Sequence, residues 1–341
     1  MTKTIVLVHG AWLNSKAWEN WKLRYERRGY IVVAPDWPGD EGDPVDLKAH
    51  PRHELVNYGP KEIVTHFERI IGALPEQPII IGHSAGGTFT QHLLDRGLGV
   101  AGVAVDPAPT PGVRIPLTAA ISTLPVLGDP FSGRKVVSMT KRFFGKRFAN
   151  GLPRDQVDYH FERYIVPTAG KFYWDGLLGG AGPITWNSRT RAPLLLIGGG
   201  LDLIAPATLT RLIYEKQKQA ASLTELLIYE DRSHYVCAEP GWEEVADFAL
   251  AWAEKNPAGR QRCRPGRLNQ RAGGEATTTG EYDEDPIDAT NCRGERAGLS
   301  PGPGRDQLRT RAFRALSLQP RHAILAVCGT DRPSEGGRLR P

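Results

Sequence analysis

The sequence predicts an α/β protein: a mostly parallel sheet of about six strands with helices on both faces and an inserted helical cap. Three observations support this prediction. Short, β-branched apolar runs alternate with longer amphipathic segments over the first 105 residues. The alternation stops between residues 107 and 192, and it resumes from residue 193. Strands that are separated by helical crossovers pair in parallel, which covers both faces of the sheet.

The predicted elements follow in order along the chain. The first part predicts strands at residues 4–8, 30–34, 78–81 and 100–105, and helices at 15–28, 59–73 and 85–96. The strand runs are nearly continuous in apolar character, as expected of strands that are buried on both faces. Residues 107–192, rich in Pro, Gly and aromatic residues, predict a cap of short helices. The last part predicts strands at 193–197 and 224–229, and helices at 206–220 and 241–255.

Charge and composition divide the chain into two parts. Residues 1–257 contain 28 Lys and Arg and 28 Asp and Glu, whereas residues 258–341 contain 15 Arg, no Lys and 10 acidic residues. The first part is predicted to be one domain, and its neutral balance does not indicate nucleic acid as a partner. The second part has too few apolar residues for a packed core and is predicted to be a disordered tail. An RNA-binding arm is the alternative interpretation of this tail.

The cysteines and the apolar runs indicate neither a secreted nor a membrane-spanning protein. Three of the four cysteines lie in the tail and no CxxC pair occurs, so we expect neither a disulfide framework nor a metal site. The apolar run at residues 5–8 is too short for a signal-peptide core, and no stretch approaches the roughly 18 apolar residues of a membrane span. We therefore expect a soluble, cytoplasmic protein without a membrane span. The oligomeric state is not predicted.

A serine motif lies between a predicted strand and a predicted helix. Residues 82–86 read Gly-His-Ser-Ala-Gly, which fits the G-x-S-x-G pattern of a nucleophilic serine. The turn that exposes such a serine is strained, so the residues two before and two after it must be small. The helix that follows places its positive end at the serine oxygen. The motif predicts Ser84 as a nucleophile.

A serine nucleophile needs a base and an acid that orients the base. Asp202 follows the predicted strand 193–197, and His234 follows the strand 224–229, so both lie at the edge where parallel sheets place their chemistry. Of the nine histidines, His234 is the one in this position. Asp106, after the strand 100–105, is the alternative acid, and Asp231 is interpreted as a solvated loop residue.

The loop after the first strand is predicted to complete the site. It reads His-Gly-Ala-Trp at residues 9–12. We expect the backbone N–H groups of Ala11 and Ala85 to form an oxyanion hole, which stabilises the negative oxygen of a tetrahedral intermediate. The side chain of His9 is expected to hold this loop, and that of His83 to pack inside the turn.

Taken together, these motifs resemble the α/β-hydrolase superfamily, in the branch with a short His-Gly-x loop. The resemblance covers about residues 3–256 and rests on the run Val8-His9-Gly10-Ala11-Trp12, Trp18, the segment 29–36, the Ser84 turn, Asp202 and His234. It implies an α/β-hydrolase fold, a Ser–His–Asp triad and hydrolysis without a cofactor or metal. The chain begins at what is usually the third strand, which suggests six strands. The tail has no place in the family pattern.

The expected reaction is cleavage of a small-molecule carboxylic ester, or a related acyl substrate, through an acyl-enzyme. The cap is expected to cover an apolar pocket, with candidate lining residues Trp12, Phe143, Phe144, Tyr173 and Trp174. Alternative activities on the same scaffold are a cofactor-free haloperoxidase or perhydrolase, a carbon–carbon bond hydrolase and a lyase, because reaction type depends on the pocket. A non-catalytic ligand-binding protein is a further alternative.

Overall fold

The computed structural model describes residues 2–259, and six parallel strands form its main sheet. The strand order is β2-β1-β3-β4-β7-β8, and every neighbouring pair is parallel. The strands are β1 (Thr4–Val8), β2 (Ile31–Val33), β3 (Ile79–His83), β4 (Ala101–Val105), β7 (Leu194–Gly199) and β8 (Thr224–Tyr229). The predicted α/β fold with a mostly parallel sheet of about six strands is thus confirmed, and the strand boundaries differ from the prediction by at most two residues.

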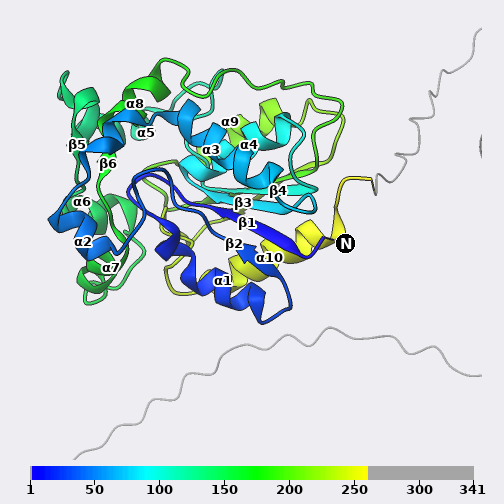
Figure 1. The fold of residues 1–341 in the computed structure, drawn as a ribbon, viewed down its shortest axis with the longest axis horizontal. Helices are drawn as coiled ribbons and strands as arrows, with labels where there is room; N and C mark the ends of the chain where they lie inside the picture. The colour runs from blue at the N-terminus through cyan, green and yellow to red at the C-terminus, as the bar shows by residue number, and fades with distance from the viewer. Residues whose placement is uncertain (1, 260–341) are drawn as a thin grey trace, which may run out of the picture. The chain divides into compact units, whose positions relative to one another are not determined.

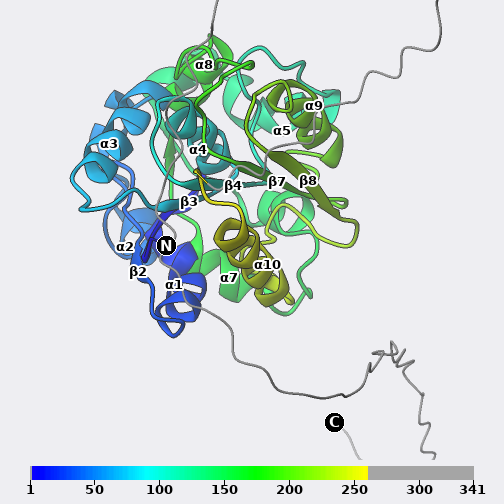
Figure 2. The ribbon, with the colours of Figure 1, turned by 90° about the vertical axis from the view of Figure 1, so that its right-hand side faces the viewer.

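Helices cover both faces of this sheet, as Figures 1 and 2 show. Helices α1 (Glu19–Glu26) and α10 (Trp242–Lys255) lie on one face. The other face carries α3 (Pro60–Gly72), α4 (Ala85–Asp95) and α9 (Ala207–Gln217). Central strands such as β1, β3 and β4 are buried along their whole length, because apolar helix faces pack on them from both sides.

The segment between β4 and β7 lies beside the main sheet, at the left in Figure 1. It contains the helices α5 (Leu117–Leu127), α6 (Lys141–Phe143), α7 (Val157–Tyr164) and α8 (Gly170–Leu177). It also contains a two-stranded antiparallel pair, β5 (Val136–Val137) and β6 (Thr168–Ala169), which the sequence did not predict. These strands have two residues each, too few to show a period of two.

Helix α2 (Pro44–Ala49) was also missed from the sequence. Its signals are local: Asp43 caps it by accepting a hydrogen bond from the Val45 amide at 2.8 Å, and Pro44 occupies its first position. Six residues give too little apolar periodicity to recognise a helix. Within residues 2–259, no helix has the length and apolar character needed to cross a membrane. The predicted tail, residues 258–341, lies almost entirely outside the described residues.

Candidate active site

Ser84 lies in a strained turn between β3 and α4. Its backbone φ is 56°, which non-glycine residues rarely adopt. A Cβ at Gly82 would lie 2.1 Å from the carbonyl oxygen of Gly86, and a Cβ at Gly86 would lie 2.0 Å from that of Val8. Only glycine fits at either position. These two contacts are the physical reason for the spacing of the motif.

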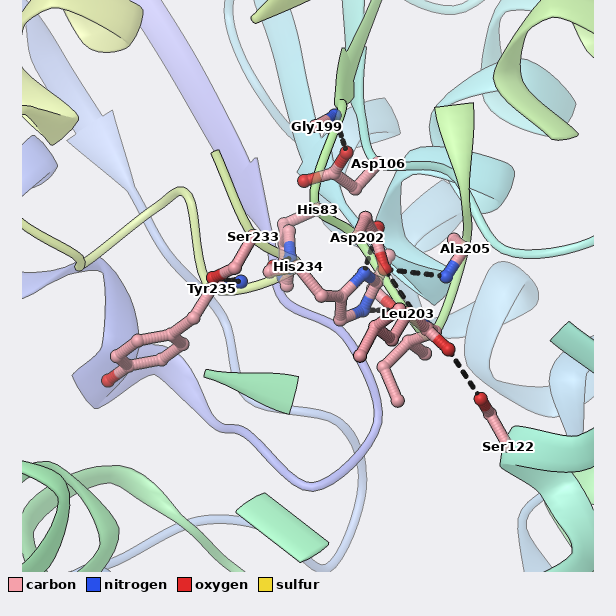
Figure 3. A network of polar contacts seen from close by, with 12 residues as sticks. His83, Asp106, Ser122, Gly199, Asp202, Leu203, Ala205, Ser233, His234 and Tyr235 are labelled. Carbon is pink, nitrogen blue, oxygen red and sulfur yellow. Dashed lines mark hydrogen bonds and ion pairs between the residues drawn. The ribbon is translucent and has the colours of Figure 1, made fainter. Parts of the chain in front are cut away.

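Three side chains form a continuous chain of hydrogen bonds at the carboxyl edge of the sheet, and Figure 3 labels two of them, His234 and Asp202. Nε2 of His234 lies 2.9 Å from Oγ of Ser84, and Nδ1 of His234 lies 2.7 Å from Oδ2 of Asp202. Because a carboxylate oxygen accepts, Nδ1 donates to Asp202. Nε2 is then left to accept the Ser84 hydroxyl proton. The structure therefore brings together the three side chains that the sequence singled out.

The Asp202 loop is fixed from two sides. Oδ1 of Asp202 accepts hydrogen bonds from the amides of Ile204 and Ala205, at 2.6 and 2.8 Å. The carbonyl oxygen of Leu203 accepts from Ser122 Oγ at 2.7 Å and from the Arg147 guanidinium at 2.9 Å. Ser122 belongs to α5, and Figure 3 shows it beside the Asp202 loop. The segment inserted after β4 therefore helps to hold the acid in place.

The His234 backbone is braced by groups that the sequence did not assign to the site. His83 donates from Nε2 to the His234 carbonyl oxygen at 2.7 Å, and burial holds the pKa of His83 well below its ordinary value. Glu239 accepts from the Ser233 amide at 2.9 Å and from the Ser233 hydroxyl at 2.5 Å. Burial raises the pKa of Glu239. No sequence pattern marks Glu239, because the loop that brings it back to Ser233 has no regular periodicity.

The loop after β1 lies against the nucleophile. A Cβ at Gly10 would lie 2.7 Å from that of Ser84, so the peptide between Gly10 and Ala11 is next to the serine. His9 donates from Nδ1 to the Gly10 carbonyl oxygen at 3.0 Å, and its Nε2 accepts from the Trp37 amide at 3.0 Å. Burial lowers the pKa of His9 to about 4, so this side chain is neutral at pH 7. It holds the loop in the way that the sequence analysis expected.

The amide of Ala85 is the first in helix α4. The first amides of a helix have no partner within the helix, and they carry the positive end of its dipole. Ala85 at the start of α4 follows Ser84 directly, and Ala11 follows Gly10 in the loop that contacts Ser84. A negatively charged oxygen formed at a carbon bonded to Ser84 would be within their field.

Asp106, the alternative acid, makes a different contact. It follows β4 with a φ of 43°, and its Oδ1 accepts from the Gly199 amide at 2.6 Å. Its Oδ2 has no hydrogen-bond partner among residues 2–259. Burial, followed by repulsion from Asp202, raises the pKa of Asp106 well above its ordinary value. The Asp231 side chain is 77% exposed and lies 3.9 Å from Arg232, away from His234.

Replacing Asp106 with asparagine is expected to stabilise the protein more at neutral than at acidic pH. Its folded-state pKa lies above the unfolded value of about 3.9, so its contribution is most favourable below about pH 4 and is lost as pH rises through the folded pKa. Asparagine keeps the acceptor for Gly199 and cannot ionise. Calorimetric melting of Asp106→Asn and the parent at pH 4 and pH 8 measures the difference. An equal gain at both pH values would contradict the assignment.

The predicted lining residues separate into two groups. The Trp12 ring lies 5.1 Å from that of Tyr173 and 6.2 Å from that of Phe143, measured between centroids. Phe144 is fully buried among the rings of other aromatic residues, and Trp174 donates to Ser132 at 2.9 Å. Trp12, Tyr173 and Phe143 form one cluster. Trp174 packs within the inserted segment, whereas Phe144 belongs to the main core and also contacts Tyr235.

One aromatic neighbour of the site was not predicted. The Phe148 ring stands edge-on to that of His234, with 4.8 Å between centroids. The site is enclosed in this conformation, because Ser84 is 8% exposed and His234 is fully buried. A groove of about 490 Å³ between α1, α7 and α10 includes none of the three side chains.

A second grouping of polar side chains overlaps the site. Possible ligand atoms of His83, Asp106 and His234 lie within 4.8 Å of one another. Nε2 of His83 and both ring nitrogens of His234 are already hydrogen-bonded to protein atoms. The grouping therefore does not offer three free donor atoms to a metal ion.

The comparisons with known proteins agree with this architecture. A family model described as "Alpha/beta hydrolase family" matches residues 5–248. A search of the curated proteins gives no significant match.

Many solved structures are similar to this chain. Three of them, described next, have low sequence identity to it. A methylesterase from Arabidopsis has 15% identity and a TM-score of 0.55, covering 74% of this chain and 99% of that chain. A monoacylglycerol lipase from Paleococcus ferrophilus has 22% identity and a TM-score of 0.52, covering 75% and 95%. Tomato methylketone synthase I has 17% identity and a TM-score of 0.57, covering 75% and 99%. At these identities the similarity shows the fold alone.

Proposed function

The chain belongs to the alpha/beta hydrolase family, and from this premise we propose that it is a serine hydrolase that cleaves a carboxylic ester. Ser84 is the nucleophile, His234 the base and Asp202 the orienting acid. The observation that carries the proposal is the unbroken hydrogen-bond chain from Ser84 through His234 to Asp202. A surface serine would have no such base in contact with its hydroxyl group.

In the first step, Oγ of Ser84 attacks the ester carbonyl carbon while Nε2 of His234 takes its proton. The imidazolium that forms is stabilised by the Asp202 carboxylate, which also keeps the remaining proton on Nδ1. His234 then gives its proton to the departing alcohol, and the acyl group stays on Ser84. A water molecule, activated by the same base, releases the acid.

The negative charge that develops on the carbonyl oxygen is stabilised by the amides of Ala11 and Ala85. These donors are part of the backbone, and the His9 side chain and the start of α4 fix their direction before the substrate binds. Donors that are already oriented stabilise a transition state without reorganisation.

The substrate is proposed to be an ester with an apolar group. Trp12, Phe143 and Tyr173 form an aromatic cluster beside the oxyanion loop, and Phe148 contacts the catalytic imidazole. Residues 107–192 act as a cap, since α5 holds the Asp202 loop and the site is closed to solvent. The names of the similar structures, a methylesterase and a monoacylglycerol lipase, agree with an ester substrate.

A fluorophosphonate probe tests this function directly. We expect the probe to label the protein once, with the adduct mapped to Ser84 by peptide mass spectrometry, and a panel of p-nitrophenyl esters of increasing acyl length to be hydrolysed. No labelling would contradict the proposal. Labelling of Ser84 without hydrolysis of any ester would reject the ester substrate, and would favour the haloperoxidase, perhydrolase, carbon–carbon hydrolase or lyase reactions at the same serine.

A further inference from the structure

Helix α5 has an inner face that holds the active-site loop and an outer face that nothing in residues 2–259 covers. Ala119, Ser122 and Val126 point inward and are buried. Leu117 and Leu124 point outward and are 75% and 57% exposed. Both faces of this helix are apolar, whereas a helix at a protein surface normally turns a polar face to water.

The exposed apolar side chains continue beyond α5. Phe131 is 71% exposed, and Leu177 and Leu178 at the end of α8 are 56% and 83% exposed. Helix α8 packs against α5 and against the turn that follows Phe131, so these side chains belong to one region of the cap. We call this region the apolar cap surface, and its members are Ile115, Leu117, Ile121, Leu124, Phe131, Leu177 and Leu178. Exposed apolar groups gathered in this way mark an interaction surface.

The charge of the cap is opposite to that of the rest of the domain. Residues 107–192 contain 12 Lys and Arg and 5 Asp and Glu, whereas the remainder of residues 1–257 contains 16 and 23. Four exposed basic residues of residues 107–150 have no carboxylate within salt-bridge distance in the described part of the chain: Arg114, Arg134, Arg142 and Lys146. Arg114 lies three residues before Leu117 in the sequence, close to the outer face of α5. Arg147 bonds to Ser122 on the inner face and does not belong to this surface.

We propose that the apolar cap surface docks on an anionic lipid surface. Leucine and phenylalanine side chains enter the boundary between headgroups and acyl chains, while Lys and Arg pair with anionic headgroups. A second copy of the chain fits less well, because a twofold contact would place two basic caps against each other. Residues 258–341, with 15 Arg and 10 acidic residues, have a net charge of the same sign as the cap and are a poorer match in charge. A nucleic acid would pair with the basic side chains but would not bury the exposed leucines.

Docking at this surface would place the lipid next to the active site. The inner face of α5 bonds to Leu203, next to Asp202, while the outer face meets the lipid. The proposal stands without any assignment of the reaction, because it rests on exposed apolar groups and charge alone.

Sedimentation of the full chain with vesicles tests the proposal. The vesicles contain diether phosphatidylcholine, alone or mixed equally with diether phosphatidylglycerol; neither lipid carries a carboxylic ester, so binding is separated from turnover. We expect preferential binding to the anionic vesicles, weakened by salt. Leu117→Ser/Leu124→Ser is expected to lower the partition coefficient by about tenfold or more, because two leucines lose their apolar burial.

The matched control is Leu23→Ser/Leu212→Ser, which changes two leucines that are 47% and 39% exposed on α1 and α9. Its partition coefficient should remain within about twofold of the parent's. Phe131→Ser is the second patch variant, in case the first does not fold. Equal partition of patch and control variants would overturn the proposal. So would a concentration-dependent dimer that the patch variants abolish, which would assign the surface to a second copy. Every variant retains the Arg-rich segment, residues 258–341. Any affinity of that segment for anionic lipid is therefore the same in all of them and does not affect the comparison of their partition coefficients.

Discussion

Replacing Ser84 with alanine is expected to lower kcat for a p-nitrophenyl ester by about 10⁴- to 10⁶-fold and to leave the fold intact. The hydroxyl group supplies the only atom that bonds to the substrate in the proposed reaction. Alanine fits the same turn, since the neighbouring glycines are unchanged and the backbone amide of residue 84 still donates its hydrogen bond to the Val105 carbonyl oxygen. Initial rates against acyl chain length, with circular dichroism of both proteins, provide the measurement.

Ser138, an exposed serine of the inserted segment, gives the matched control. Ser138→Ala should hydrolyse the ester at the parent rate. If Ser84→Ala retained the parent rate, the nucleophile would be wrong, and hydrolysis would have to use another group. If it lost fluorophosphonate labelling but kept turnover, labelling and catalysis would occur at separate sites.

The second large effect is expected from Asp202→Asn, which should lower kcat by about 10⁴-fold at neutral pH. The asparagine oxygen retains the bonds from Ile204 and Ala205, so the loop stays in place. Its amide group would then face Nδ1 of His234 and, being a donor, would require Nδ1 to accept. The ring proton would move to Nε2, where it would block removal of the Ser84 proton.

Stopped-flow rates and melting curves separate this chemical effect from unfolding. Asp231→Asn is the control, because Asp231 lies three residues before His234 and its side chain is 77% exposed. Asp231→Asn should hydrolyse the ester at the parent rate. A similar loss in both variants would mean that net charge near the site, and not the imidazole tautomer, controls the rate. Full activity of Asp202→Asn would move the role of the acid to another residue, with Asp106 the nearest candidate.

Strands with a continuous apolar run could be predicted from the sequence. β1 has the residue range that the sequence predicted, because five consecutive apolar or β-branched residues have few alternative structures. The edge strand β8 also has its predicted range, although it is only partly buried and contains the exposed Glu225. Shorter elements carry less information. Helix α2 and the pair β5–β6 have too few residues for a period, and their boundaries depend on caps and on contacts from distant parts of the chain.

The candidate site shows the same division. Ser84 is marked by a local pattern, because the strain of its turn and the nearness of Val8 allow only glycine at Gly82 and Gly86. Asp202 and His234 were identified from their places after strands. Glu239, Phe148 and Ser122 have no such mark. They reach the site through tertiary packing, over separations that no local spacing encodes.

By itself, the sequence determined the parallel sheet, the turn at Ser84 and the strand ends that carry Asp202 and His234, since each follows from periodicity or from local steric limits. Tertiary structure decided the rest. It paired Asp202 with His234 and left Asp106 bonded to Gly199, a choice set by loop geometry at the sheet edge. It also turned one apolar face of α5 inward onto Leu203 and left the other exposed, because only packing decides which face of an apolar helix is buried.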